Sequence, residues 1–305
     1  MRSQSPMDEL DSLSVRDLRA VVTLAERLHF GKAAEDLAIA QPSLSAAVKK
    51  VERVLGERLF ERTSRHVSLT PAGQKTVQRV RLVLEELAEI GRTRGRKEAL
   101  SGRFRLGLVP TIGPYYAPRF LGPLRERYPK LELVLTEALT EALLHMLRQR
   151  SLDAAILCLP TGEWGLTEVP LLREPFLLAA PAHHPILREP AVSLDQLDPR
   201  EILLMERGHC LREQTLETCG TNPESALNPT QAASVETLRH LVATGSGCAL
   251  LPQMAVAAGL DCAGLVRYVP FREPAPGRTI GLVFHDRCTH TEDAAELAGF
   301  LKEIS

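Results

Sequence analysis

The sequence lacks any apolar run long enough to cross a membrane. No stretch approaches the roughly 20 apolar residues that span a bilayer, and the opening segment MRSQSPMDELDSL has no apolar signal-peptide core. We therefore expect a cytoplasmic protein without membrane contact. The start of translation stays open between Met1 and Met7.

The composition also lacks the extremes of disordered, fibrous or disulfide-rich chains. Hydrophobic residues make up 44% and charged residues 25%, as in average globular proteins. The 305 residues predict two or three domains, since a domain usually takes about 100 to 200 residues. The net charge of −1 hides a basic segment, because residues 41–81 contain nine basic and three acidic side chains. Such a bias is typical of nucleic-acid binding, and also of a solvated helix face.

Cysteine pairs at metal-binding spacing are missing as well. No Cys-x-x-Cys occurs, and the pairs His183-His184 and His209-Cys210 lack the short repeated spacings of a structural zinc site. We expect no metal and no other cofactor. In a reducing compartment the cysteines should be thiols; they are Cys158, Cys210, Cys219, Cys248, Cys262 and Cys288.

The segment over residues 12–70 predicts a winged helix-turn-helix. Apolar residues recur at helical spacing in SVRDLRAVVTLAERL, behind a Ser14 cap. A short helix FGKAAEDLAIA and a third, SLSAAVKKVERVLG, follow, with Pro42 in the first turn and Gly56 as the stop. The next segment, ERLFERTSRHVSLT, alternates arginine with apolar residues like a basic β-wing.

Polar residues gather on the first turn of the third helix, where a recognition helix meets base edges. Arginine and lysine further along would reach phosphates, although simple exposure explains each residue taken alone. The residues predicted to contact DNA are Gln41, Pro42, Ser43, Ser45, Lys49, Arg62 and Arg65.

A long helix is predicted from Pro71 onward. Val77, Val80, Leu84 and Leu87 step by three, four and three residues, which is coiled-coil spacing. The Gly- and Arg-rich segment GRTRGRKEALSG ends this helix. We expect a dimerising linker helix and hinge over residues 71–101, while a helix packed on its own domain would show the same spacing.

Beyond Gly102, short apolar runs alternate with helical patterns. The order FRLGLVP, LGPLRERY, LELVLTEA, EALLHMLRQR and AAILCLP predicts β-α-β-α-β and a mainly parallel sheet. A last helix is expected over about residues 292–304. Ligands of such α/β sheets bind at the carboxyl ends of strands, which directs attention to PTIGP, to Thr140 and to GHC.

The stretch LRAVVTLAERLHFGKAAEDLAIAQPSLSAAVKKVERVLGERLFERTSRHVSLTPAG resembles the DNA-binding domain of LysR-type transcriptional regulators. The likeness covers nearly the whole chain. It implies an α/β regulatory domain over residues 102–305 with two Rossmann-like, periplasmic-binding-protein-like lobes: lobe I at about 102–172 and 277–305, and lobe II at about 173–276. It also implies a homo-oligomer, commonly a dimer of dimers, that binds promoter DNA and acts on RNA polymerase.

The segment GHCLREQTLETCG contains the best candidate nucleophile, Cys210. A helix N-terminus with His209 and Arg212 nearby should lower the thiol pKa. A helix over residues 210–219 would separate the Cα atoms of Cys210 and Cys219 by about 13 Å, whereas a disulfide needs about 4.4 to 6.8 Å. Disulfide formation would therefore require local refolding. The alternative is that both are inert, small apolar residues.

A closer resemblance favours the reactive interpretation. GLVPTIGPYYAP, LLMERGHCLREQ and SVETLRHLVATGSGCALLP are similar to stretches of the hydrogen-peroxide sensors of this family. The resemblance implies oxidation of Cys210 to a sulfenic acid, then a disulfide with Cys219, activation of oxidative-stress genes, and resetting by glutaredoxin or thioredoxin. The implied peroxide-binding residues are Thr111, Thr140, His209 and Arg212. Glu213 stands where these sensors more often have aspartate.

Two other interpretations stay open. The first is a LysR-type regulator that binds a small organic effector between its lobes, with Thr111 and Ser234 as ligands and no redox step. The second is a thiol peroxidase or another α/β enzyme; the sequence has no Gly-x-Ser-x-Gly, Walker A or Gly-x-Gly-x-x-Gly motif, and we expect no turnover enzyme. Cys158 and Cys248 lie in apolar strands and should be buried and inert.

Overall fold

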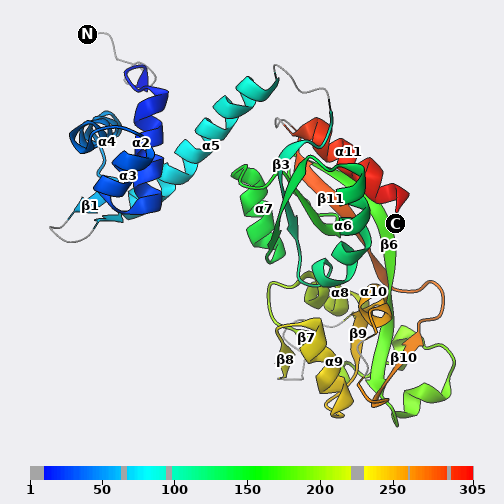
Figure 1. Ribbon diagram of the computed structural model, residues 1–305. Helices are drawn as coiled ribbons and strands as arrows, with labels where there is room; N and C mark the ends of the chain where they lie inside the picture. Colours follow the sequence, from blue (N-terminus) through cyan, green and yellow to red (C-terminus); the bar gives the residue numbers. More distant parts are fainter. Residues whose placement is uncertain are drawn as a thin grey trace. The chain divides into compact units, whose positions relative to one another are not determined.

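The computed structural model describes residues 10–62, 67–93, 98–220, 230–259, 262–286 and 290–304 (Figure 1). The chain divides into two compact units, residues 1–96 and 97–305. Within the described ranges, no helix combines the length and apolar character needed to cross a bilayer.

The first unit is a helix-turn-helix with a two-stranded wing. Its elements are α2 (Val15–Arg27), α3 (Phe30–Asp36), α4 (Gln41–Leu55), β1 (Phe60–Arg62), β2 (Val67–Leu69) and α5 (Pro71–Thr93). Ser14 and Asp17 form a reciprocal capping box that starts α2. Helix α4 ends at Gly56, whose positive φ of 68° suits glycine. Strands β1 and β2 pair antiparallel, which confirms the predicted wing.

Helix α5 differs in part from the predicted seam. Val77 is buried in the core of the first unit, so this position packs on its own domain. Val80 is buried too, whereas Leu87 and, outside the predicted seam, Val83 are exposed. Helical spacing alone could not distinguish packing on the helix's own domain from a dimer contact, because both place one apolar face on the helix.

The second unit begins with the predicted β-α-β-α-β order in lobe I. It runs through β3 (Gly102–Leu108), α6 (Gly113–Arg127), β4 (Leu131–Glu137), α7 (Thr140–Arg148) and β5 (Ala154–Leu159), and lobe I is completed by β11 (Gly277–His285) and α11 (Thr291–Glu303). Strand β3 pairs parallel with both β4 and β5. One apolar core fills this lobe, with Phe104, Tyr116 and Phe120 fully buried.

The prediction of a mainly parallel sheet is wrong. Strand β6 (Leu166–Pro181) runs the length of both lobes, as Figure 1 shows, and β11 returns antiparallel to both β5 and β6. Strands β9 (Ala249–Pro252) and β10 (Val266–Pro270) also pair antiparallel with β6. The sheet is mixed because the chain crosses to lobe II on a strand and comes back on a strand, without a helical crossover.

Lobe II has its own apolar core on the far half of β6. Its further elements are η1 (Pro185–Arg188), η2 (Leu194–Gln196), η3 (Pro199–Glu201), β7 (Leu204–Met205), α8 (Cys210–Thr218), β8 (Gln231–Ala232), α9 (Val235–Ala243) and α10 (Gln253–Ala257). Leu211 and Leu216 anchor α8 in this core. The first residue of α8, Cys210, packs instead against the core of lobe I, so the helix starts where the two lobes meet.

Candidate redox site

Cys210 is the first residue of α8, and His209 is its N-cap residue. Cys219 follows as the C-cap residue, so the predicted helix between the two cysteines is confirmed. Their sulfur atoms thus belong to opposite ends of a nine-residue helix. Cys219 packs against the core of lobe II, and burial raises its pKa to about 11.

Thr111 and Cys158, both from lobe I, approach the sulfur of Cys210. The Thr111 Oγ1 atom lies 3.3 Å from Cys210 Sγ, and Cys158 Sγ lies 3.5 Å from it. Arg278 Nη1 donates to Thr111 Oγ1 at 3.1 Å. Because a guanidinium can only donate, the Thr111 oxygen accepts this bond and its own hydrogen is free to point at the sulfur.

These contacts hold the pKa of Cys210 well below its ordinary value. The hydrogen bond from the Cys158 thiol lowers it most, and the positive charge of Arg278, the Thr111 hydroxyl and the Leu211 backbone N–H add to the effect, while burial opposes them. The pKa of Cys158 is raised well above its ordinary value, chiefly by the same hydrogen bond. The shared proton therefore stays on Cys158, and Cys210 is the thiolate, which is the reactive form.

Arg278 is the charged residue that sequence analysis missed. It lies on β11 opposite Glu174 of β6, and the two side chains form a buried ion pair of 2.7 Å with each side chain 1% exposed. Glu174 also accepts the Met254 backbone N–H at 2.8 Å. A Cβ on Gly277 would lie 2.5 Å from the Glu174 carbonyl oxygen, so glycine allows the strands to approach closely at this point. An arginine inside the apolar strand RTIGLVFH was the only available signal.

The predicted peroxide-binding residues lie together around a narrow pocket, with one difference. Thr111, Thr140, His209 and Cys210 line it. The buried Thr140 Oγ1 has no hydrogen-bond partner, and burial lowers the pKa of His209, which favours its neutral form. Arg212 instead donates to the Met205 carbonyl oxygen at 2.8 Å. The positive charge that was expected from Arg212 comes from Arg278.

Of the two other cysteines that were expected to be buried and inert, Cys158 differs from the expectation. Cys158 was expected to be inert, yet its sulfur contacts Cys210. Cys248 is buried, as expected, and Cys262 is partly buried. Cys288 lies outside the described residues.

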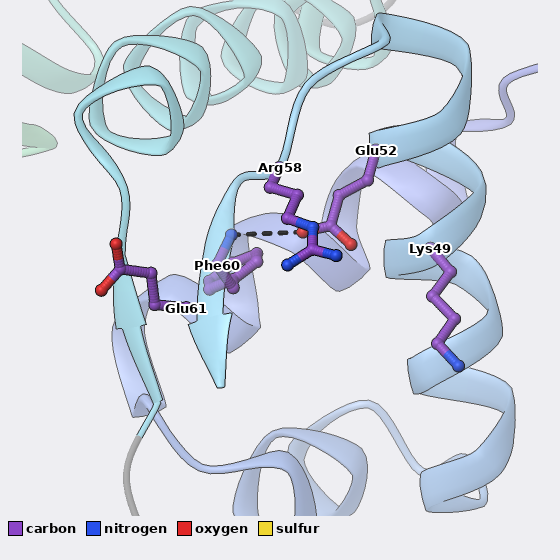
Figure 2. A pocket seen from close by; sticks show the side chains of 5 residues that line it. All are labelled: Lys49, Glu52, Arg58, Phe60 and Glu61. Carbon is purple, nitrogen blue, oxygen red and sulfur yellow. Dashed lines mark hydrogen bonds between the residues drawn. The ribbon is translucent and has the colours of Figure 1, made fainter. Parts of the chain in front are cut away.

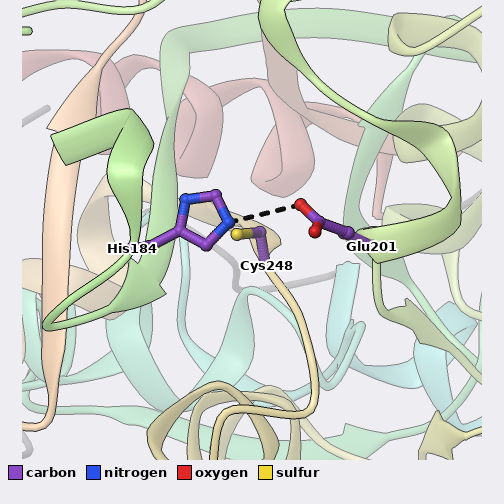
Figure 3. A group of neighbouring side chains, drawn as sticks. All are labelled: His184, Glu201 and Cys248. Carbon is purple, nitrogen blue, oxygen red and sulfur yellow. Dashed lines mark hydrogen bonds and ion pairs between the residues drawn. The ribbon is translucent and has the colours of Figure 1, made fainter.

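A second thiol cluster lies in lobe II. The candidate ligand atoms of His184, Glu201 and Cys248 all lie within 4.8 Å of one another (Figure 3). His184 Nε2 and Glu201 Oε2 are 3.2 Å apart. Short paired spacings could not have revealed this group, because its members are far apart in the sequence. That no metal binds this protein stays a prediction.

The predicted DNA-contact residues lie on the outer face of α4. Gln41, Pro42, Ser43 and Lys49 are exposed and Ser45 is partly exposed, while Leu44, Val48 and Val51 face the core. The side chain of Arg62 and all of Arg65 lie outside the described residues.

Beside this face, Glu52 connects α4 to the wing. Its carboxylate accepts the backbone N–H groups of Leu59 and Phe60 at 3.0 and 3.2 Å. Figure 2 shows Lys49 and Arg58 at the edge of the adjacent pocket. Two cations thus flank the junction of helix and wing.

Family comparisons cover both units of the chain. Residues 15–74 match the bacterial regulatory helix-turn-helix protein, lysR family, and residues 97–304 match the LysR substrate binding domain. The DNA-binding transcriptional dual regulator OxyR of Escherichia coli is 42% identical over 275 residues, which cover 89% of each chain.

Solved structures give the same result. A full-length OxyR variant from Pseudomonas aeruginosa has a TM-score of 0.76 and 34% identity, over 96% of this chain and 99% of that one. A hydrogen-peroxide-bound OxyR cysteine mutant from Corynebacterium glutamicum has a TM-score of 0.66 and 33% identity, over 95% of this chain and 92% of that one.

Proposed function

This chain belongs to the LysR family of bacterial regulators, and we propose that it is a promoter-binding transcriptional regulator that senses hydrogen peroxide through Cys210. The observation that carries the proposal is the set of contacts on the Cys210 sulfur. A thiol at 3.3 Å from a hydroxyl, beside a buried arginine and at a helix N-terminus, is stabilised as the thiolate. The relatives include hydrogen peroxide-inducible genes activators of Escherichia coli, and this activity fits the chemistry of Cys210.

Peroxide would react in the pocket that Thr111, Thr140 and His209 line. The Cys210 thiolate attacks one oxygen, so that an S–O bond forms and the O–O bond breaks. The second oxygen leaves as hydroxide and becomes water after it takes up a proton. The partnerless hydroxyl of Thr140 is a hydrogen-bond donor for an oxygen in this pocket. The product is a neutral sulfenic acid on Cys210.

We propose that Cys219 then resolves the sulfenic acid. Its thiol displaces the hydroxyl group, an S–S bond forms, and water leaves. Since both cysteines belong to the ends of α8, this disulfide requires the helix to come apart. Arg212 would lose its bond to the Met205 carbonyl, which detaches the segment from β7. A covalent step is thereby coupled to a conformational change.

The rearrangement would act through the domain arrangement implied by the family. Residues 12–70 bind promoter DNA, residues 71–101 form the linker helix and hinge, and residues 102–305 form the sensing domain. The exposed Val83 and Leu87 of α5 would contact a second copy, in a dimer or a dimer of dimers. The regulator works on chromosomal DNA in the cytoplasm, acts on RNA polymerase, and is reset by glutaredoxin or thioredoxin without sustained turnover.

The test is peroxide-dependent footprinting on a promoter fragment. We expect stoichiometric peroxide to change the footprint of the reduced protein, the Cys210→Ser variant to lose the change, and the Cys248→Ser variant to keep it. Binding should weaken as salt rises, because phosphate contacts release counterions. A change that survives in Cys210→Ser would overturn the proposal, and a change caused by a metabolite would support an organic effector between the lobes.

A further inference from the structure

Cys158 lies opposite Cys210 across the junction of the two lobes. Cys158 is on β5 of lobe I, whereas Cys210 begins α8 of lobe II. Both side chains pack against the lobe I core, and their sulfur atoms are 3.5 Å apart. Two thiols that are far apart in the sequence are thus in contact in the folded protein.

The distances favour Cys158 over Cys219 as the first partner of Cys210. A disulfide bond is about 2.05 Å long, so the two sulfur atoms need to approach by only about 1.5 Å from their 3.5 Å separation. The Cα atom of Cys219 is about 13 Å away along α8. Reaction with Cys219 therefore requires unfolding of the helix, whereas reaction with Cys158 requires a side-chain movement.

We propose that Cys158 is a second resolving cysteine, which forms a disulfide with Cys210 while α8 stays folded. This inference rests on the proposed oxidation of Cys210 by peroxide. Once Cys210 is a sulfenic acid, the Cys158 sulfur attacks the Cys210 sulfur, the S–S bond forms and the S–O bond breaks. The hydroxyl group leaves as water with the thiol proton. In sum, two thiols are oxidised and one peroxide is reduced to two waters.

The surroundings of Cys158 assist this step. Arg278 Nη1 lies 3.8 Å from Cys158 Sγ, and its charge lowers the pKa of that thiol. The main cause that raises the pKa of Cys158 is the hydrogen bond to Cys210. Oxidation converts the Cys210 thiolate to a neutral group, which removes this cause while Arg278 stays in place. Formation of the sulfenic acid thus makes Cys158 a better nucleophile.

The two disulfides have opposite structural consequences. A bond between Cys158 and Cys210 joins β5 to the start of α8, so it links the lobes and keeps the helix in place. A bond between Cys210 and Cys219 lies within lobe II and removes the helix. The product with Cys158 is therefore an oxidised form without the rearrangement, and it competes with the signalling form.

Trypsin separates the three cysteines, which makes the products easy to distinguish. Cleavage after arginine places Cys158 in peptide 151–173, Cys210 in peptide 208–212 and Cys219 in peptide 213–239. The experiment treats reduced full-length protein with one equivalent of hydrogen peroxide. Acid quenching, alkylation with N-ethylmaleimide, digestion and mass spectrometry follow. Wild type, Cys219→Ser, Cys158→Ala and Cys158→Ser are compared, with Cys248→Ala as the matched buried-cysteine control.

We expect peptide 208–212 of Cys219→Ser to be linked to peptide 151–173 in most molecules. The two Cys158 variants should link peptide 208–212 only to peptide 213–239, and Cys248→Ala should match wild type. The inference is overturned if Cys210 of Cys219→Ser ends as a dimedone-reactive sulfenic acid while Cys158 is still alkylated. If peptide 208–212 is not oxidised in any variant, the proposed function fails instead.

A second measurement reports the state of α8. Arg212 is buried in the helix, so trypsin should cut the native protein after this residue only when α8 unfolds. Oxidised Cys219→Ser should resist this cut as well as the reduced protein does. Trypsin should cut oxidised Cys158→Ala after Arg212 at least tenfold faster than it cuts oxidised Cys219→Ser. Equal rates of cleavage in the two oxidised variants would contradict two structurally distinct products.

Discussion

The surroundings of Cys210 and of Cys248 both include a histidine and a charged side chain, but the charge has the opposite sign: it is positive near Cys210 and negative near Cys248. The pKa of Cys210 is lowered, most by the hydrogen bond from Cys158 and further by the positive charge of Arg278. Cys248 faces Glu201, and burial together with that carboxylate raises its pKa to about 12. Burial opposes the thiolate in both regions. The sign of the neighbouring charge and the number of donors therefore decide which cysteine is reactive.

The largest effect should come from removing the charge that separates the two regions. Arg278→Gln leaves Glu174 buried without its partner, and we expect a loss of about 3 to 5 kcal/mol in the free energy of unfolding. Urea unfolding measures this. Glu201→Gln is the control, since its side chain is 52% exposed, and it should change stability by less than about 1 kcal/mol. Equal losses of stability in the two variants would contradict the claim that the charge beside Cys210 is buried and paired while the charge beside Cys248 is exposed.

Alkylation rates should separate the two thiols directly. At pH 7 we expect iodoacetamide to modify Cys210 on the order of a hundredfold faster than Cys248, because only the thiolate reacts. The rate at Cys210 should level off below pH 8.5, since the pKa of this thiol is lowered. Peptide mass spectrometry at several pH values follows both sites. Similar alkylation rates at the two cysteines would contradict the claim that neighbouring charges and donors decide which thiol is reactive.

A smaller effect should follow from Thr111→Val, which keeps the shape and removes the hydroxyl. The 3.3 Å contact with Cys210 Sγ is lost, and the other donors remain. We expect the rate of peroxide oxidation to fall about tenfold, because the other donors remain and the loss lies at the lower end of the roughly 1.5 to 3 kcal/mol that a hydrogen bond to a charged group contributes. Stopped-flow oxidation measures it. Thr244→Val, on the surface of lobe II, should leave the rate unchanged.

The smallest effect concerns the pH dependence of stability, and its sign should differ between the two regions. The lowered pKa of Cys210 stabilises the fold above the unfolded value of about 8.5, and this contribution is lost as pH falls through the folded pKa. The raised pKa of Cys248 stabilises below about 8.5, and this is lost as pH rises toward 12. Between pH 6 and pH 10, the free energies of unfolding of Cys210→Ala and Cys248→Ala should therefore differ from that of wild type by about 1 kcal/mol. These two differences should change with pH in opposite directions.

The local elements of the site could be predicted, whereas its long-range contacts could not. The helix that starts at Cys210 follows from a short segment of sequence, and so does the recognition helix α4. Arg278 and Cys158 join the site through strand register, because Ile280 pairs with Cys158 and Arg278 pairs with Glu174. A mixed sheet fixes this register only in the folded chain. The resemblance to known sensors supplied Thr111 and Thr140, and it offered nothing for Cys158.

Strand β6 also determines how the sensing domain can move. It carries hydrogen-bonded partners in both lobes, and Gly277 packs tightly against its backbone at the crossing. Closing the lobes around a ligand would bend the continuous strand β6, whereas unfolding of α8 leaves the strand pairing of β6 in place. The domain therefore combines a sheet that continues through both lobes with one helix, α8, that can unfold separately. Such a domain suits a ligand as small as peroxide, which is recognised by its reaction with a thiolate.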